Sequence, residues 1–147
     1  MNTISVLLVD DNLTFLRIAT RFLQKHNDIV IAGAFNGGKE AMEQAHTLQP
    51  DIVLIDLAMS DLPGLEAIPR LRVMLPGAGI IALTLLDANS YRPAALAAGA
   101  DDFVSKATMS TDLLPAVWRT AQAKRLAQQK LVSVTACRVR GERDDKR

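Results

Sequence analysis

The 147-residue sequence contains a single cysteine, Cys137, and only two histidines. One cysteine cannot close a disulfide within the chain, and it has no neighbouring cysteine with which to build a metal site. No apolar run approaches the ~20 residues that cross a bilayer, and the N-terminus lacks a basic region followed by an apolar stretch and a cleavage site. The sequence therefore predicts a cytoplasmic protein without a disulfide, a thiolate centre or a membrane span.

Charge is unevenly distributed along the chain, although the net charge is only +1. Residues 1–118 hold 8 Lys and Arg against 13 Asp and Glu, whereas residues 119–147 hold 9 against 3. A basic arm can bind acidic surfaces or nucleic acid, but a solvated helix face followed by a frayed tail is the simpler interpretation. We expect one domain over residues 1–131 and a basic, disordered tail or linker over residues 132–147.

Short apolar runs alternate about five times with segments of helical period. The predicted strands cover residues 4–9, 29–34, 52–55, 80–83 and 103–104. The predicted helices cover residues 13–26, 38–48, 65–75, 91–98 and 113 to about 131. Because the strand runs are continuously apolar, they suit a parallel sheet buried on both faces, with helices as right-handed crossovers. The predicted fold is α/β, a doubly wound parallel sheet with helices on both faces.

Polar side chains follow the predicted strands where each strand ends. Asp10 and Asp11 follow the first strand, Asp56 the third, Thr84 the fourth and Lys106 the fifth. In an open parallel sheet, ligands bind at the carboxyl ends of the strands, so these side chains are expected to gather at one edge.

Three carboxylates at one edge repel one another unless a cation lies among them. Oxygen ligands without histidine or cysteine favour Mg²⁺, which shares its coordination shell with phosphoryl groups. A carboxylate nucleophile such as Asp56 can take a phosphoryl group while the metal and Lys106 neutralise the transferring oxygens, and Thr84 can donate a hydrogen bond. The pattern indicates phosphoryl transfer.

Each of these residues also has a structural explanation when it is taken alone. Asp10-Asp11 can be a helix N-cap, Asp56 a turn residue, Lys106 a solvated surface lysine and Thr84 a β-branched strand residue. Their joint placement at the same end of successive strands favours the functional interpretation.

Five segments carry a resemblance to a known family. Residues 9–12 (VDDN), 51–59 (DIVLIDLAM), 62–64 (LPG), 82–84 (ALT) and 98–106 (AGADDFVSK) resemble the receiver domains of bacterial two-component response regulators, and the match covers roughly residues 3–130. The resemblance implies a five-stranded sheet of order 2-1-3-4-5. It implies a phosphorylation-activated signalling switch in which Asp56 accepts a phosphoryl group from a sensor histidine kinase or a phosphotransfer protein.

The same resemblance assigns roles to individual residues. Asp11, Asp56 and the backbone carbonyl of Ala58 would ligate Mg²⁺, and Asp10 would reach it through water. Thr84 and Lys106 would hold the phosphoryl oxygens. Phe103 matches the switch aromatic whose ring turns inward when Thr84 moves toward the phosphate, although an ordinary core phenylalanine is the alternative. Ala58 and Leu86 flank the path of the water that hydrolyses the acyl phosphate.

Such a protein is not an enzyme in the ordinary sense, because it catalyses only its own phosphorylation and dephosphorylation. The expected relay surface is formed by the fourth helix, the fifth strand and the fifth helix. A downstream protein target or an output domain would read it, and a homodimer is an open alternative. Nothing after residue 131 has the apolar period of a DNA-binding helix-turn-helix. The chain is expected to be a stand-alone receiver or the front of a longer regulator.

Three rival functions use the same layer architecture. A flavodoxin-like electron carrier would need a hydroxyl- and glycine-rich phosphate loop after the first strand, where this chain has Asp10-Asp11-Asn12-Leu13. A pseudo-receiver that lost its chemistry would not be expected to keep the whole acidic, hydroxyl and lysine set. A hydrolase using Asp56 would need a general acid, for which the sequence offers no candidate at a fixed short spacing, and fold alone cannot license that activity.

Overall fold

Five parallel strands form one sheet in the order β2-β1-β3-β4-β5, and five α-helices connect and follow them. The computed structural model describes the backbone of residues 3–145 and the side chains of residues 3–131. The strands are β1 (Ile4–Val9), β2 (Ile29–Phe35), β3 (Ile52–Ile55), β4 (Gly79–Thr84) and β5 (Asp102–Ser105). The helices are α1 (Leu13–Gln24), α2 (Gly38–Leu48), α3 (Gly64–Met74), α4 (Ala88–Ala98), the 3-10 turn η1 (Lys106–Thr108) and α5 (Met109–Asp145). The predicted fold class and strand order are confirmed.

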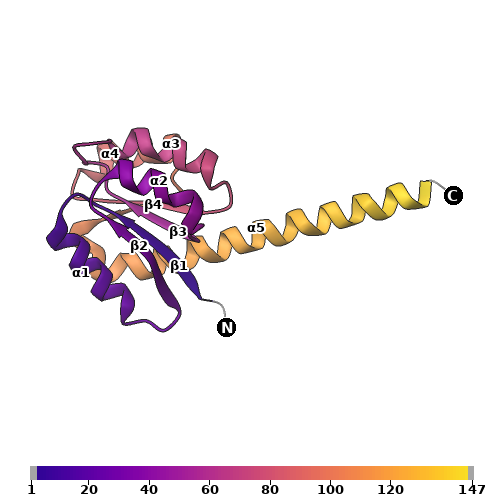
Figure 1. Cartoon of the computed structure of the whole chain (residues 1–147), viewed down its shortest axis with the longest axis horizontal. Coiled ribbons are helices and arrows are strands. Elements are labelled where there is room, and N and C mark those ends of the chain that lie inside the picture. The colour runs from indigo at the N-terminus through magenta and orange to yellow at the C-terminus, as the bar shows by residue number, and fades with distance from the viewer. Residues whose placement is uncertain (1–2, 146–147) are drawn as a thin grey trace.

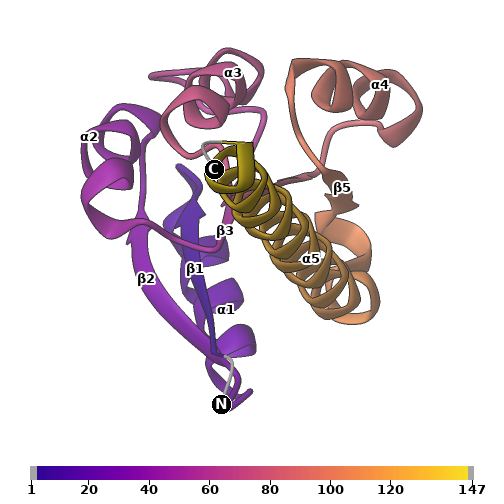
Figure 2. The ribbon, with the colours of Figure 1, turned by 90° about the vertical axis from the view of Figure 1, so that its right-hand side faces the viewer.

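Each face of the sheet carries its own hydrophobic core. One core joins strand residues such as Leu7 and Val53 to α2, α3 and α4, and the other joins residues such as Val6 and Leu8 to α1 and α5. Figure 2 shows the same division, with α2, α3 and α4 on one side of the strands and α1 and α5 on the other. Successive strand residues point to opposite faces, so an apolar strand feeds both cores at once.

Helix α5 is the longest element and extends well beyond the sheet (Figure 1). Three contacts fix its first half to the opposite end of the molecule from the predicted site. The Trp118 indole N–H donates to Asp28 Oδ2 at 2.7 Å. Arg125 donates to the Thr3 carbonyl at 2.8 Å, and Lys124 Nζ lies 2.9 Å from Asp101 Oδ1. The helix therefore leaves the domain in a defined direction.

The disordered tail predicted after residue 131 differs from the structure, in which the helical backbone continues to Asp145. The segment contains no proline, and it extends a helix that is already nucleated, so each added residue gains a hydrogen bond at little extra cost. Residues 146–147 lie outside the described part of the chain. The division of the chain at residue 131 stays a prediction.

Helix α4 begins three residues earlier than predicted, at Ala88 instead of Tyr91. The carboxylate of Asp87 accepts a hydrogen bond from the Asn89 N–H at 3.3 Å and so caps the helix. Gly99 ends it at a φ of 123°, a conformation that favours glycine. Across residues 3–145, no helix is both long and apolar enough to cross a membrane.

Candidate functional site

The carboxyl ends of the strands bring the predicted site residues to one edge of the sheet. Asp10 directly follows β1 and Asp56 directly follows β3, while Thr84 ends β4 and Lys106 directly follows β5. Backbone hydrogen bonds hold the two aspartates, from Asp10 N to Phe35 O at 3.1 Å and from Asp56 N to Val9 O at 3.0 Å. The sheet ladder itself therefore sets the separation of these carboxylates.

Three carboxylates form a compact cluster at this edge. One oxygen each of Asp10, Asp11 and Asp56 lies within 4.8 Å of the others. Asp10 and Asp56 are only 4% and 6% exposed, whereas Asp11 is exposed. The Ser60 N–H donates to Asp11 Oδ2 at 3.2 Å, and the Ala58 N–H donates to Asp56 Oδ1 at 3.2 Å. The loop after β3 thus contacts two of the three carboxylates.

Lys106 places its ammonium group among these carboxylates. Its Nζ lies 2.5 Å from Asp10 Oδ2 and 3.2 Å from Asp56 Oδ2, and its side chain is 7% exposed. The same nitrogen lies 4.2 Å from the centre of the Phe15 ring. The lysine neutralises part of a charge cluster that would otherwise repel itself.

Burial raises the pKa of the Asp10 carboxyl above its usual range, and the nearby charge of Asp56 adds to the rise. The hydrogen bond and charge of Lys106 and the hydrogen bond from the Asn12 N–H act in the opposite direction without cancelling the effect. A buried carboxylate in this state favours a further cation beside it.

The loop between β3 and α3 is held by Asp61 and Gly64. The Asp61 carboxylate accepts hydrogen bonds from the backbone N–H groups of Gly38, Lys39 and Leu62 at 2.8 to 3.1 Å. These bonds, led by that from Lys39, lower the pKa of Asp61. A Cβ on Gly64 would lie 2.5 Å from the Asp56 carbonyl oxygen, so only glycine fits there without a shift of the backbone. The loop that follows Asp56 is therefore tied to α2 and packed closely on α3.

The donor set fits Mg²⁺. Carboxylate oxygens of Asp10, Asp11 and Asp56 share one small space, and hard oxygen ligands are those that Mg²⁺ prefers. The exposure of Asp11 leaves room for the water molecules that Mg²⁺ retains.

Thr84 and Phe103 lie deeper in the fold than the carboxylates. Thr84 is 1% exposed, and its Oγ1 accepts a hydrogen bond from the Leu86 N–H at 3.3 Å. Phe103 is 4% exposed and belongs to the core on the α2–α4 side. Arg92 of α4 donates to the Phe103 carbonyl at 3.1 Å, and its guanidinium carbon lies 6.0 Å from the centre of the Phe103 ring. The aromatic ring is thus inward in this structure and is covered by an α4 side chain.

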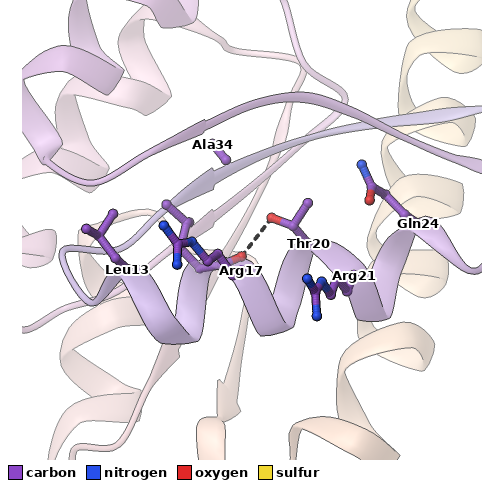
Figure 3. A pocket seen from close by; sticks show the side chains of 7 residues that line it. Leu13, Arg17, Thr20, Arg21, Gln24 and Ala34 are labelled. Atoms are coloured by element: carbon purple, nitrogen blue, oxygen red, sulfur yellow. Dashed lines mark hydrogen bonds between the residues drawn. The ribbon is translucent and has the colours of Figure 1, made fainter.

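A groove of about 330 Å³ runs along α1 beside β2 and is separate from the carboxylate cluster. Figure 3 shows Leu13, Arg17 and Thr20 of α1 along it, with Ala34 of β2 opposite. The Thr20 hydroxyl donates to the Leu16 carbonyl at 2.7 Å and is therefore satisfied within its own helix. The groove shares no lining residue with the carboxylate cluster, so a ligand seated in it would contact α1 and β2 instead.

Sequence reasoning did not predict the contacts of three residues that shape the site, which are Phe15, Ser60 and Asp61. Phe15 contacts Lys106, and Ser60 contacts Asp11. Asp61 anchors the loop between β3 and α3 to the start of α2. The sequence gives a weak local signal for the position of Phe15, which stands three residues after Asn12. Asparagine often caps a helix by accepting a hydrogen bond from the backbone N–H at that spacing. The partners of Ser60 and Asp61 depend on the packing of segments distant in the chain.

Comparison with known proteins identifies the family. The sequence model of the response regulator receiver domain matches residues 6–118. The response regulator protein VraR of Staphylococcus aureus is 38% identical over 125 residues, covering 83% of this chain and 58% of VraR. The chain thus spans less than two thirds of the length of that relative.

Solved structures show the same architecture. The response regulator domain of Thermotoga maritima CheB superposes with a TM-score of 0.77 at 26% identity, covering 82% of this chain and 98% of that one. A LuxR-family two-component response regulator from Aurantimonas gives a TM-score of 0.78 at 22% identity, covering 88% and 99%, and this likeness shows the fold alone. The chain belongs to the response regulator receiver family of two-component signalling.

Proposed function

We propose that this chain is a phosphorylation-activated switch in which Asp56 accepts a phosphoryl group from a sensor histidine kinase or a phosphotransfer protein. The observation that carries the proposal is the position of Lys106 Nζ, 3.2 Å from Asp56 Oδ2, inside a cluster that also holds the Asp10 and Asp11 carboxylates. A nucleophilic carboxylate, a fixed cation and a set of oxygen ligands are the groups that phosphoryl transfer requires.

The transfer conserves charge and atoms. An Asp56 carboxylate oxygen attacks phosphorus, and the P–N bond of the donor phosphohistidine breaks as the O–P bond forms. The leaving imidazole nitrogen takes a proton from solvent, and Asp56 becomes an acyl phosphate. Lys106 is already within hydrogen-bond reach of Asp56, so its ammonium needs only a small shift to face a phosphoryl oxygen. Thr84 stands at the end of the neighbouring strand as a second donor to that group.

Asp11, Asp56 and the Ala58 carbonyl would hold the Mg²⁺ ion, with Asp10 reaching it through water. When bound, the ion supplies positive charge that neutralises the transferring phosphoryl oxygens. The arrangement of the loop after β3 supports this assignment, because Ala58 and Ser60 already bond to Asp56 and Asp11 through their N–H groups. The Ala58 residue is exposed, and its carbonyl belongs to the same loop.

The relay would run through α4, β5 and α5. Thr84 ends β4, and Phe103 lies on β5 beneath Arg92 of α4, so a movement of Thr84 toward the phosphoryl group would change the packing around Phe103. Activation is then a population shift between two packings of one fold. A downstream protein target or an output domain would read the changed surface. The chain would catalyse only its own phosphorylation and dephosphorylation. This cycle would take place in the cytoplasm.

The test is to incubate the protein with acetyl phosphate, a small-molecule phosphodonor, and Mg²⁺. The expected result is a mass increase of one phosphoryl group on Asp56, located by mass spectrometry after borohydride trapping. The increase should disappear with EDTA and in Asp56→Asn, while Asp51→Asn serves as the control in an exposed aspartate outside the site. Equal labelling of Asp56→Asn would overturn the proposal.

A further inference from the structure

Lys106 and three other residues, Asp10, Asn12 and Phe15, form a closed circuit of contacts. The Asn12 N–H donates to Asp10 Oδ1 at 2.9 Å, and the Asn12 side-chain oxygen accepts from the Phe15 N–H at 3.0 Å. The centre of the Phe15 ring lies 4.2 Å from Lys106 Nζ, and Lys106 Nζ lies 2.5 Å from Asp10 Oδ2, which closes the circuit. Each member is therefore held from two sides, and the position of the lysine is coupled to the first turn of α1.

Among the residues whose side chains the structure describes, Phe15 is the one uncharged side chain in contact with the Lys106 ammonium. The other two partners are the Asp10 and Asp56 carboxylates, and the lysine side chain is 7% exposed. A cation within about 6 Å of an aromatic centre is attracted by the negative face of the ring, and more strongly where water is largely excluded. Phe15 is half-buried and packs against the α1–α5 core, so the core side chains hold its ring in position.

We infer that Phe15 is a positioning residue for the proposed phosphoryl transfer, and that it holds the Lys106 ammonium in place as the charges around it change. This inference rests on the proposed function of Asp56. When a phosphoryl group is attached to Asp56 and a metal ion binds the carboxylates, the charged partners of Lys106 are altered. The Phe15 ring is not altered, because the first turn of α1 that carries it is fixed by the Asn12 cap.

The geometry allows one ring contact to serve both states. Lys106 Nζ is 3.2 Å from Asp56 Oδ2, the carboxylate that would carry the phosphoryl group. A shift of the ammonium toward that group by about one bond length, ~1.5 Å, keeps it within the ~6 Å reach of a cation–π contact. The ring contact is therefore kept in both states. It stabilises the phosphorylated state more, because the carboxylates that also hold the ammonium in the unphosphorylated state would then be engaged by the phosphoryl group and the metal ion.

The test replaces Phe15 with mono-, di- and trifluorophenylalanine, which weaken the negative ring face stepwise and hardly change its shape. The probe is beryllofluoride, a phosphoryl mimic, titrated in Mg²⁺, together with the rate of Asp56 labelling by acetyl phosphate. Affinity and rate are expected to fall in step with fluorination, by about two- to thirtyfold over the series, the factor that corresponds to the range of cation–π strengths. Phe15→Tyr, which keeps an aromatic face, should retain most of both, and Phe15→Leu should lose as much as the trifluoro variant.

The control is the same fluorinated series at Phe22, whose ring contacts His26 edge-on at 6.3 Å between centroids. This series should leave affinity and rate unchanged, and unfolding free energies measured for both series separate positioning from stability. Equal or tighter beryllofluoride binding across the Phe15 series would overturn the inference while leaving the proposed function intact. Failure of the unmodified protein to bind beryllofluoride and to accept phosphate would instead overturn the proposed function, and this inference with it.

Discussion

Lys106 Nζ lies 2.5 Å from Asp10 Oδ2, so a buried lysine occupies part of the space in which the carboxylates would hold a metal ion. Removing one partner of a buried ion pair is costly, because the remaining charges stay buried without compensation. The Lys106→Met variant should therefore lose about 3 kcal/mol of unfolding free energy without Mg²⁺. Added Mg²⁺ should stabilise the variant more than the wild type, since the ion no longer competes with an ammonium group.

Urea unfolding with and without MgCl₂ measures this effect. Lys130→Met, in an exposed lysine of α5, is the matched control and should change stability by less than about 0.5 kcal/mol. An equal response to Mg²⁺ in wild type and Lys106→Met would contradict the prediction.

A second prediction concerns the close approach of α3 to the phosphoacceptor loop. In Gly64→Ala, the new Cβ would meet the Asp56 carbonyl oxygen at 2.5 Å and Leu57 Cα at 2.6 Å, both backbone atoms that cannot move aside cheaply. The variant should lose about 2 to 3 kcal/mol of stability and accept phosphate from acetyl phosphate more slowly. Gly77→Ala meets only the end of the Gln128 side chain, which can rotate away, so it should lose less than about 0.5 kcal/mol. Similar losses in both variants would be against this account.

A third prediction uses the network of ion pairs and hydrogen bonds at Asp101, a surface residue whose side chain is 26% exposed. Burial acts to raise the pKa of Asp101, but hydrogen bonds from Lys124, the Ile80 N–H and Arg72 outweigh it and hold the pKa below its usual range. Because the folded-state pKa is depressed, the carboxylate contributes stability above its unfolded pKa of about 3.9. That contribution is lost as the pH falls through the folded-state pKa.

Because solvent screens these partly exposed pairs, Asp101→Asn should cost about 1 kcal/mol at pH 7 and progressively less below pH ~4. Urea unfolding at a series of pH values measures the difference between the wild type and this variant. Glu43→Gln, at an exposed position on α2, is the control and should show no such dependence. A gap that stays constant down to pH ~3 would argue that ionisation of Asp101 is not involved.

The lifetime of the phosphorylated state gives a fourth prediction. Hydrolysis of an acyl phosphate needs a water molecule aligned behind phosphorus, and the apolar side chains of Ala58 and Leu86 cannot hold one by hydrogen bonds. Autodephosphorylation should be slow in the wild type, and the double variant Ala58→Asn, Leu86→Glu should lose phosphate faster. Loss of phosphate from the purified phosphoprotein in Mg²⁺ measures this, with both single variants as comparisons. Equal or slower decay in all three would show that water access is controlled elsewhere.

A fifth prediction concerns the relay surface. Amide chemical shifts recorded on adding beryllofluoride should change most over residues 84–118, because Thr84 ends β4 and Phe103 and Arg92 link β5 to α4. Residues of α2, such as His46 on its exposed side, should change least. Changes restricted to the loops around Asp11 and Ala58 would mean that the site does not couple to this surface.

The sheet and the positions of the site residues could be predicted because both depend on local pattern. The apolar runs at residues 4–9 and 52–55 predict buried parallel strands wherever they pair, and parallel strands bring their carboxyl ends to one edge. Asp10, Asp56, Thr84 and Lys106 follow such runs, so their gathering at that edge needed no knowledge of packing. The start of α4 was less predictable, since the Asp87 cap lies outside the apolar pattern.

The contacts within the site were decided by tertiary structure. The sequence places Lys106 near the carboxylates, but only the packed fold selects Asp10 as its nearer partner and sets the Phe15 ring against its ammonium. Asp61 reaches the N-terminus of α2 across 23 positions of sequence, a pairing that no local pattern encodes. Backbone periodicity and capping depend on residues a few positions apart, and these the sequence determines by itself. Distances between side chains from different elements depend on how those elements pack, and that is a property of the whole fold.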